Sequence, residues 1–253
     1  MSGFLWLVSV LDIAEMIRNI LLWAVPVMMA VIFHEVAHGY AALRLGDTTA
    51  RDMGRLTLNP LPHIDPMGTV MIPLILIAVG SPFIFGYAKP VPVNFLRLRK
   101  PKRDMVYVAA AGPATNLLLA FSAALLLRLC YLVDPSLFMP LINHDAAIGF
   151  AASLVLTAIR MLFFLFALSV VLALFNLFPV PPLDGGRIAV GILPQNLARS
   201  YARIEPFGML IVIFIFIFDP FGIFSGILGI GMGIIARLLL GGDLLPFLAA
   251  ALS

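Results

Sequence analysis

The sequence predicts a polytopic α-helical membrane protein, and three observations support this expectation. Hydrophobic residues make up 62% of the 253 residues and charged residues only 11%. A soluble domain is about half apolar and roughly a quarter charged, because its surface must stay hydrated. The mean hydropathy is +1.09, and apolar runs of about 20 residues, enough to cross a bilayer, recur along the chain. We expect about five to six transmembrane helices, a re-entrant segment and a short β-strand region.

The remaining composition excludes several classes of protein. The single cysteine, Cys130, rules out a disulfide scaffold, a cysteine zinc site and an iron–sulfur cluster. The net charge of +3 and the pI near 9.3 do not predict a nucleic-acid partner, because a basic excess in a membrane protein marks its cytoplasmic loops. The N-terminus lacks the basic region of a cleavable signal peptide, so we expect it to be retained.

The first half of the chain contains segments of different kinds. Residues 1–18 are apolar and then mixed, which favours an interfacial helix, whereas residues 19–45 form the first convincing membrane helix. A polar loop follows at 46–65. Residues 66–85 are apolar but carry three prolines and two glycines, so we expect them to enter the membrane and return on the same side. Residues 86–104 are short and basic.

The second half continues the helical pattern. The expected elements are a helix over 105–133 interrupted at Gly112-Pro113, a long helix over 146–179, and a hairpin of two short spans over 204–218 and 221–240. The loops are too short for an inserted soluble domain. We therefore expect one membrane-embedded domain over residues 1–253, with its core in 19–186 and a C-terminal hairpin in 204–240.

The most informative residues are the five from His34 to His38, with the sequence His-Glu-Val-Ala-His, in the second half of the first strong helix. Four residues turn an α-helix by about 400°, so the two imidazoles lie on one face within about 40°. This spacing lets His34 and His38 bind one metal ion while Glu35 lies beside it to act on water. The alternative is a polar seam in which the three side chains pair with one another. Ionisable groups at membrane depth are expensive and usually functional, which favours the metal site.

A catalytic zinc site needs a third protein ligand and one open position. Asp184 is the best candidate, although an ordinary helix cap is the alternative. It follows a proline-rich stretch that cannot be regular helix, and such backbone is tolerated at membrane depth where it is buried or lines a water-filled cavity. The other candidates are less suited, since we expect Asp47 and Asp52 as solvated loop charges, Asp65 as a helix N-cap and His63 as a loop histidine near the headgroups.

Three blocks of the sequence resemble the site-2 proteases, the zinc metalloproteases that cut inside membranes. The blocks are His34-Glu35-Val36-Ala37-His38-Gly39, Gly112-Pro113-Ala114-Thr115-Asn116, and Asn176-Leu177-Phe178-Pro179-Val180-Pro181-Pro182-Leu183-Asp184-Gly185-Gly186. The resemblance implies one Zn²⁺ ion per chain, bound by His34, His38 and Asp184, with Glu35 as general base. The chain lacks the PDZ domain of some members and the CBS domains of others, so we expect a minimal, core-only member.

The resemblance also implies that Asn116 and Asn176 contact the substrate or stabilise the transition state. Each asparagine lies in an apolar span, where an amide needs hydrogen-bond partners. The alternative for both is hydrogen bonding between helices, typically worth under about 2 kcal/mol. A functional role is favoured for Asn116, because Gly112-Pro113 just before it frees backbone groups at the same depth.

The function that the resemblance implies is hydrolysis of peptide bonds within or near transmembrane segments of membrane-protein substrates. The alternative is a non-proteolytic metal-binding membrane protein or a metal transporter. A transporter needs ionisable residues along a path through several helices, whereas here they gather at one depth. A membrane di-iron oxygenase would need more than the four histidines of this chain.

The basic residues predict the orientation of the chain in a cell membrane. Residues 44–103 and 180–206 contain twelve of the sixteen lysines and arginines, so we expect that side, with the active site near it, to be cytoplasmic. The helix over 105–133 must then start on the side where the first helix ended. This parity requires Gly46 and Arg99 to lie on the same face of the membrane.

The sequence Lys89-Pro90-Val91-Pro92-Val93-Asn94 predicts an extended strand at the margin of a sheet. Pro90 and Pro92 remove hydrogen-bond donors from one edge of the strand, while Val91 and Val93 keep theirs on the other. One interpretation is that the prolines protect an edge against aggregation. The functional interpretation is that an unwound substrate adds here as a strand.

Overall fold

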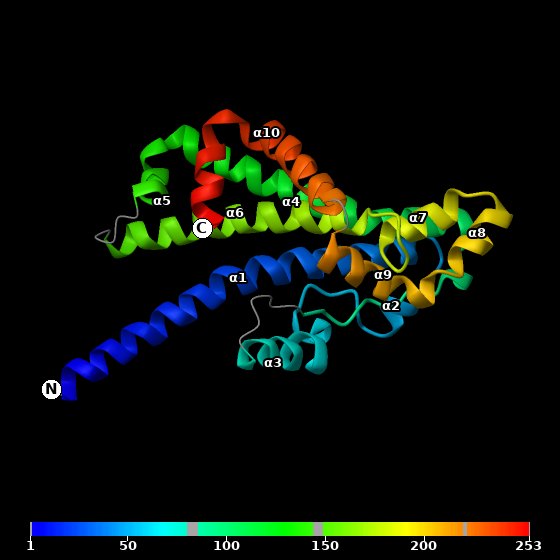
Figure 1. The fold of residues 1–253 in the computed structure, drawn as a ribbon, viewed down its shortest axis with the longest axis horizontal. Coiled ribbons are helices and arrows are strands. Elements are labelled where there is room, and N and C mark those ends of the chain that lie inside the picture. Colours follow the sequence, from blue (N-terminus) through cyan, green and yellow to red (C-terminus); the bar gives the residue numbers. More distant parts are fainter. Residues whose placement is uncertain (1, 80–85, 144–148, 220–221, 253) are drawn as a thin grey trace. The chain divides into compact units, whose positions relative to one another are not determined.

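The computed structural model describes residues 2–79, 86–143, 149–219 and 222–252, and the regular secondary structure in these ranges is helical. Figure 1 shows the helices with their labels. The long helices are α1 (Ser2–Arg44), α4 (Pro101–Val133), α6 (Phe150–Asn176) and α10 (Ile223–Leu252). The shorter ones are α2 (Thr49–Asp52), α3 (Ile72–Ala78), α5 (Met139–Asn143), α7 (Asp184–Ile192), α8 (Gln195–Ala202) and α9 (Glu205–Phe218).

Four helical stretches of the described chain are long and apolar enough to cross a membrane. They are Ile20–Arg44, Pro101–Val133, Ala151–Asn176 and Ile223–Leu252. The two shorter apolar helices, Pro66–Leu76 and Glu205–Ile215, fall below the roughly 20 residues of a complete span. The protein is thus a polytopic helical membrane protein, with fewer full-length spans among its described residues than the five to six expected.

Two expected breaks between helical segments are absent. Helix α1 is continuous from Ser2 to Arg44, so no break separates residues 1–18 from the first membrane helix in its described part. Helix α4 runs through Gly112-Pro113, and the predicted interruption there is wrong. Proline removes one backbone hydrogen bond from a helix, but helices of membrane proteins tolerate it where neighbouring groups satisfy the freed carbonyl.

The chain divides into two compact units. The first comprises Met1–Ala30, Leu118–Val171 and Ile230–Ser253, and the second Val31–Leu117 and Leu172–Gly229. In the first unit, the fully buried ring of Phe138 lies 5.5 Å from that of Tyr131 and 5.4 Å from that of Phe247, measured between ring centroids. The candidate site residues all belong to the second unit.

Within the second unit, the two ends of the segment that follows Asp65 lie next to each other, at Gly68 and Tyr87. The Asp65 carboxylate accepts hydrogen bonds from two N–H groups of the next helical turn, at 3.0 and 2.7 Å, which confirms the predicted N-cap. The Tyr87 N–H donates to the Gly68 carbonyl oxygen at 3.1 Å. The chain therefore comes back beside the place where it left. Residues 80–85 of the expected excursion over 66–85 lie outside the described residues.

The loop after α1 meets the loop before α4. The Arg99 N–H donates to the Leu45 carbonyl oxygen at 3.0 Å. Gly46 has φ +114°, and a Cβ added there would lie 3.3 Å from Cγ of Arg99. Helix α1 thus ends beside the start of α4, which agrees with the expected parity of the two helices.

Asp47 is fully buried, so its prediction as a solvated loop charge is wrong. Its carboxylate accepts hydrogen bonds from the Thr49 N–H at 3.0 Å and the Asn94 N–H at 2.6 Å. Burial alone would raise the pKa of Asp47, but the hydrogen bonds from Thr49 and Asn94 lower it below the usual value. The carboxylate joins the loop after α1 to the loop before α4, which explains its burial.

The expected strand at Lys89–Asn94 is not formed, because residues 86–94 have no regular secondary structure. Their backbone groups bind side chains instead of a second strand: the Val91 N–H donates to Glu35 and the Asn94 N–H to Asp47. Val93 packs against a buried apolar cluster that includes Leu98. Alternating prolines suit extended backbone, but a strand also requires a partner, and the described chain provides none here.

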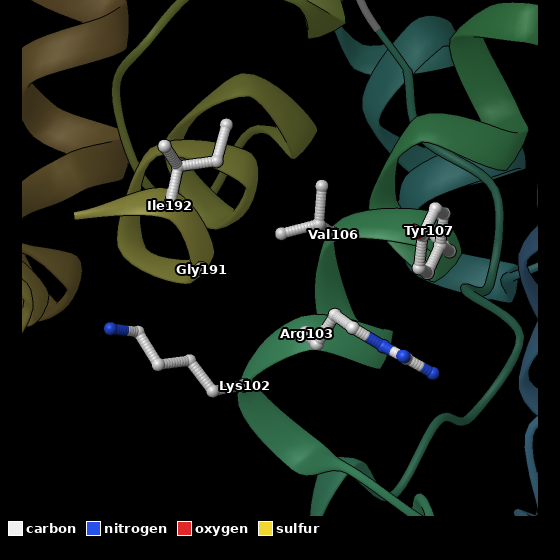
Figure 2. A pocket seen from close by; sticks show the side chains of 6 residues that line it. All are labelled: Lys102, Arg103, Val106, Tyr107, Gly191 and Ile192. Atoms are coloured by element: carbon white, nitrogen blue, oxygen red, sulfur yellow. The ribbon is translucent and has the colours of Figure 1, made fainter. Parts of the chain in front are cut away.

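Helix α7 packs closely against the start of α4. A hollow of about 360 Å³ lies between them (Figure 2), and it is lined by Lys102, Arg103, Val106, Tyr107, Gly191 and Ile192. A Cβ added at Gly191 would lie 3.0 Å from the Lys102 carbonyl oxygen. The Lys102 ammonium donates to the Leu193 carbonyl oxygen, just beyond the end of α7. These contacts connect the helix that carries Asp184 to the helix that carries Asn116.

Candidate metal centre

Three side chains converge on one point in the second unit. His34 and His38 lie one turn apart on α1, and Asp184 is the first residue of α7. The Asp184 Oδ2 atom lies 3.2 Å from Nε2 of His34 and 3.3 Å from Nε2 of His38, and the two Nε2 atoms are 3.0 Å apart. All three residues are buried. The structure thus brings together the three residues that the sequence predicts as ligands, in a group that could hold a metal ion.

The spacing of these three atoms fits a tetrahedral zinc ion. Zinc binds histidine nitrogen and carboxylate oxygen at about 2.0–2.2 Å, so two ligand atoms of a tetrahedral site lie about 3.3 Å apart. The separations of 3.0, 3.2 and 3.3 Å are close to that value. Two imidazoles and one carboxylate leave a fourth position open, which is the arrangement of catalytic zinc sites.

Helix α4 provides a hydrogen-bond partner for each imidazole. Nδ1 of His38 lies 2.7 Å from the Val108 carbonyl oxygen, so it is the protonated nitrogen and Nε2 is left to bind a metal ion. Nδ1 of His34 lies 3.2 Å from the Asn116 amide, and the Asn116 Oδ1 atom is buried without a partner among the described residues. A 180° rotation of this amide, which leaves its shape unchanged, lets Oδ1 accept from the His34 Nδ1–H. Both rings then present Nε2 to the ion.

Asp184 is held in place by the two glycines that follow it. A Cβ at Gly185 would overlap the carbonyl of Leu177, and one at Gly186 would overlap the backbone of Pro181. The glycines therefore let α7 begin directly against the proline-rich segment. The Asp184 Oδ2 atom therefore faces the Nε2 atoms of both imidazoles, at 3.2 and 3.3 Å, and has no hydrogen-bond partner among the described residues. A cation held between these three atoms would satisfy that oxygen.

Gly112 lies directly against the imidazole rings of His34 and His38. A Cβ added there would lie 2.5 Å from Nε2 of His38 and 2.6 Å from Cε1 of His34. The two imidazoles therefore fit only beside a glycine. Sequence reasoning interpreted Gly112 as a helix break and missed this function, because the contact joins residues more than seventy positions apart.

Glu35, the expected general base, lies between the two histidines in the sequence and is half-buried. Its Oε2 atom accepts a hydrogen bond from the Val91 N–H at 2.7 Å. Val91 was expected to offer this donor to a substrate strand, but in the structure the donor is used inside the chain. Val93, the other residue of that expected strand, packs its side chain against the buried cluster of Ala42, Leu98 and Val108.

The remaining candidates lie outside the group of three ligands. The Asn176 amide donates to the Leu172 carbonyl oxygen of its own helix at 2.9 Å. His63 lies in the loop between α2 and α3, as expected, and is buried, with Nε2 2.9 Å from the Thr57 carbonyl oxygen. A loop histidine is not recognisable as buried from sequence, since its partner here is a backbone carbonyl of the same loop.

Comparison with known proteins connects this geometry to one enzyme family. Residues 22–218 match peptidase family M50. The protein named "Putative zinc metalloprotease YwhC" from Bacillus subtilis is 36% identical over 199 residues, which cover 78% of this chain and 80% of that protein. "Putative zinc metalloprotease Rip2" from Mycolicibacterium smegmatis is 31% identical over 191 residues, and Rip2 from Mycobacterium tuberculosis is 28% identical over 193 residues. Each match covers 75% of this chain and 64% of Rip2. No solved structure matches the chain.

Proposed function

Because the chain belongs to peptidase family M50, we propose that it hydrolyses peptide bonds within or near transmembrane segments of other membrane proteins. Family membership makes it a zinc metalloprotease and confirms the expected relationship to site-2 proteases. The observation that carries the finer proposal is that two of the three candidate ligands, His34 and His38, lie inside the candidate membrane span Ile20–Arg44. A hydrolytic centre at that position meets substrates that are themselves in the membrane.

In this proposal, His34, His38 and Asp184 hold one zinc ion per chain. When bound, zinc polarises the scissile carbonyl group and makes water nucleophilic at neutral pH. The Glu35 carboxylate takes the proton from the attacking water and delivers it to the leaving nitrogen. The substrate helix must be unwound locally before this attack, because a helix shields its peptide bonds.

The two asparagines have different roles in the proposal. Nδ1 of His34 lies 3.2 Å from Nδ2 of Asn116. With its amide rotated by 180°, Asn116 accepts from the His34 Nδ1–H through Oδ1 and fixes the orientation of that ring. Asn176 contacts the substrate. Its amide N–H group is engaged with Leu172, so its amide oxygen is the atom that would accept from a substrate N–H.

We place the enzyme in the cell membrane as a multi-pass protein, with the site near the cytoplasmic side. The distribution of the twelve basic residues supports this orientation. Seven residues separate His38 from Leu45 at the end of the span, which is about 10 Å of helix. Water therefore has to reach a site about 10 Å below the helix end. Residues 19–186 form the catalytic core in this proposal, within one domain over 1–253 that includes the hairpin at 204–240.

The test is cleavage of a model single-span substrate by the purified protein in liposomes, together with measurement of bound zinc. We expect cleavage that a zinc chelator stops and added zinc restores. Glu35→Gln should retain zinc and lose cleavage, whereas Asp184→Ala should lose zinc. Asp52→Ala is the matched control, because Asp52 is exposed and pairs with Arg51. Zinc binding without cleavage, accompanied by zinc flux into the liposomes, would instead establish the transporter.

A further inference from the structure

The backbone amide of Val91 contacts the side chain that we propose as general base. The Val91 N–H donates to Oε2 of Glu35 at 2.7 Å, and Val91 itself is only 6% exposed. One carboxylate oxygen is therefore fixed by the backbone. Among the described residues no hydrogen bond is found to the other oxygen, which would accept the proton in general-base catalysis.

A buried arginine holds the segment that carries this amide. Nη2 of Arg55 donates to the Lys89 carbonyl oxygen at 2.8 Å and to the Pro90 carbonyl oxygen at 3.3 Å. The Lys89 N–H in turn donates to the His63 carbonyl oxygen at 2.9 Å. The two residues before Val91 are thus fixed through both carbonyls and one N–H.

The segment Lys89–Val91 also packs against α1, the helix that carries His34 and His38. A Cβ added at Gly39 would lie 2.8 Å from Cγ1 of Val91 and 2.5 Å from Cδ2 of Leu56. Gly39 directly follows the ligand His38, and Leu56 directly follows Arg55. The side chains of Leu56 and Val91 therefore both pack against the turn of α1 at Gly39, next to the metal centre.

The charge of Arg55 is expensive at this position. The residue is 6% exposed, and its Nε atom has no hydrogen-bond partner in the described part of the chain. None of the ion pairs found among the described residues includes Arg55. Burying a cation without a counter-ion is unfavourable, because the charge loses its hydration. Stability alone therefore does not explain an arginine at position 55. Its hydrogen bonds to the Lys89 and Pro90 carbonyl oxygens do explain it.

We propose that Arg55 is a positioning residue for the Glu35 carboxylate. Its guanidinium group fixes the Lys89–Val91 backbone, and that backbone presents the Val91 N–H that orients Glu35 toward the substrate. The inference rests on the proposed function, in which Glu35 transfers the protons of peptide hydrolysis. Misplacing a catalytic group by about 1 Å can cost about 100-fold in rate, so releasing this contact should act on turnover rather than on binding.

The test compares Arg55→Met, Arg55→Lys and the control Arg51→Met in the full-length protein in liposomes. Methionine removes the donors but leaves no buried charge, lysine keeps a charged donor, and Arg51 is an exposed arginine four positions earlier. We expect Arg55→Met to bind zinc normally and to keep its KM for a single-span substrate, with kcat reduced about 10- to 100-fold. Arg55→Lys should restore most of kcat, and Arg51→Met should behave as the unmodified protein.

Combination with Glu35→Gln separates positioning from general support. If Arg55 acts through Glu35, Arg55→Met should not reduce the residual cleavage of Glu35→Gln any further. Multiplied losses, an unchanged kcat in Arg55→Met, or a raised KM at unchanged kcat would each overturn the inference.

Val91→Pro removes the N–H itself and provides a second, independent variant. It should keep zinc and lose kcat as Arg55→Met does, and loss of zinc in both variants would reduce the network to structural support. Failure of the proposed function is distinguishable, because in that case the unmodified protein would not cleave the single-span substrate at all, whereas failure of the inference leaves the unmodified protein active.

Discussion

Replacement of Gly112 by alanine should eject the metal ion while leaving the fold intact. The added Cβ would lie 2.5 Å from Nε2 of His38 and 2.6 Å from Cε1 of both His34 and His38. Ordinary van der Waals contact begins at 3.4 Å, so the rings or the helix must move by about 0.9 Å. Zinc bonds tolerate deviations of about 0.2 Å. The required displacement is several times larger than the site can absorb.

The magnitude follows from the effect of smaller changes at metal sites. Loss of a hydrogen-bond partner of a ligand typically lowers metal affinity about 10- to 100-fold. Gly112→Ala displaces the ligands themselves, so we expect at least about a 100-fold loss of zinc affinity. The helix should not suffer, because alanine in a helix interior is favoured over glycine by roughly 0.5–1 kcal/mol.

The assay is competition for zinc with a chelator of known affinity, together with thermal unfolding of the detergent-solubilised protein in a chelator. Gly229→Ala is the matched control, because a Cβ at this position of α10 meets no heavy atom within 4 Å among the described residues. We expect weakened zinc binding with unimpaired apo-protein stability only in Gly112→Ala. Normal zinc affinity in that variant would refute the packing of α4 against the two imidazoles.

Three further predictions follow from the contacts described above. Asn116→Ala should lower zinc affinity about 10- to 100-fold in the same competition assay, because it frees the His34 ring; unchanged affinity would remove its positioning role. The folded pKa of Asp47 lies below the usual 3.8. The Asp47 carboxylate should therefore stabilise the fold fully above pH 3.8, and this contribution should be lost as the pH falls below that value. Asp47→Asn should flatten this acid dependence of the unfolding temperature. Single cysteines at Gly46 and Arg99 should be labelled from the same face of the membrane, and labelling from opposite faces would contradict the contact between their loops.

The local part of the metal centre was predictable because helix geometry is a local property. Two histidines four residues apart share a helix face whatever surrounds them, so His34 and His38 could be paired from the sequence alone. Asp184 could be added because the proline-rich stretch before it cannot be regular helix, and such backbone at membrane depth is buried or lines a water-filled cavity. Residue types and spacing were enough to single out these three candidate ligands.

The parts that were missed depend on contacts between distant segments. Asp47 has the appearance of a loop charge, and its burial follows only from a bond to Asn94, forty-seven positions later. The alternating prolines at 89–94 indicated a strand, but a strand depends on a neighbour, and these residues have no regular secondary structure. The segment instead gives its Val91 donor to Glu35. Side chains and turns can satisfy the same backbone groups as a sheet, and sequence periodicity does not distinguish the two.

The register between α1 and α4 determines which residue of α4 contacts each imidazole. Three residues of α4 at intervals of four, Val108, Gly112 and Asn116, lie on one helix face. Val108 binds His38, Asn116 binds His34, and Gly112 makes room for both rings. Since the later histidine pairs with the earlier residue of α4, the two helices run antiparallel here.

The same direction follows independently from the Arg99–Leu45 contact between the end of α1 and the start of α4. Gly112 and Asn116 are four residues apart on α4, as His34 and His38 are on α1. One turn of α4 therefore lies beside one turn of α1. A one-residue insertion in α4 between Gly112 and Asn116 would rotate Asn116 by about 100° away from His34 while leaving both imidazoles in place. Zinc affinity should then fall to the level of Asn116→Ala and no further. This result would show that the register of α4, rather than its composition, orients the His34 ring.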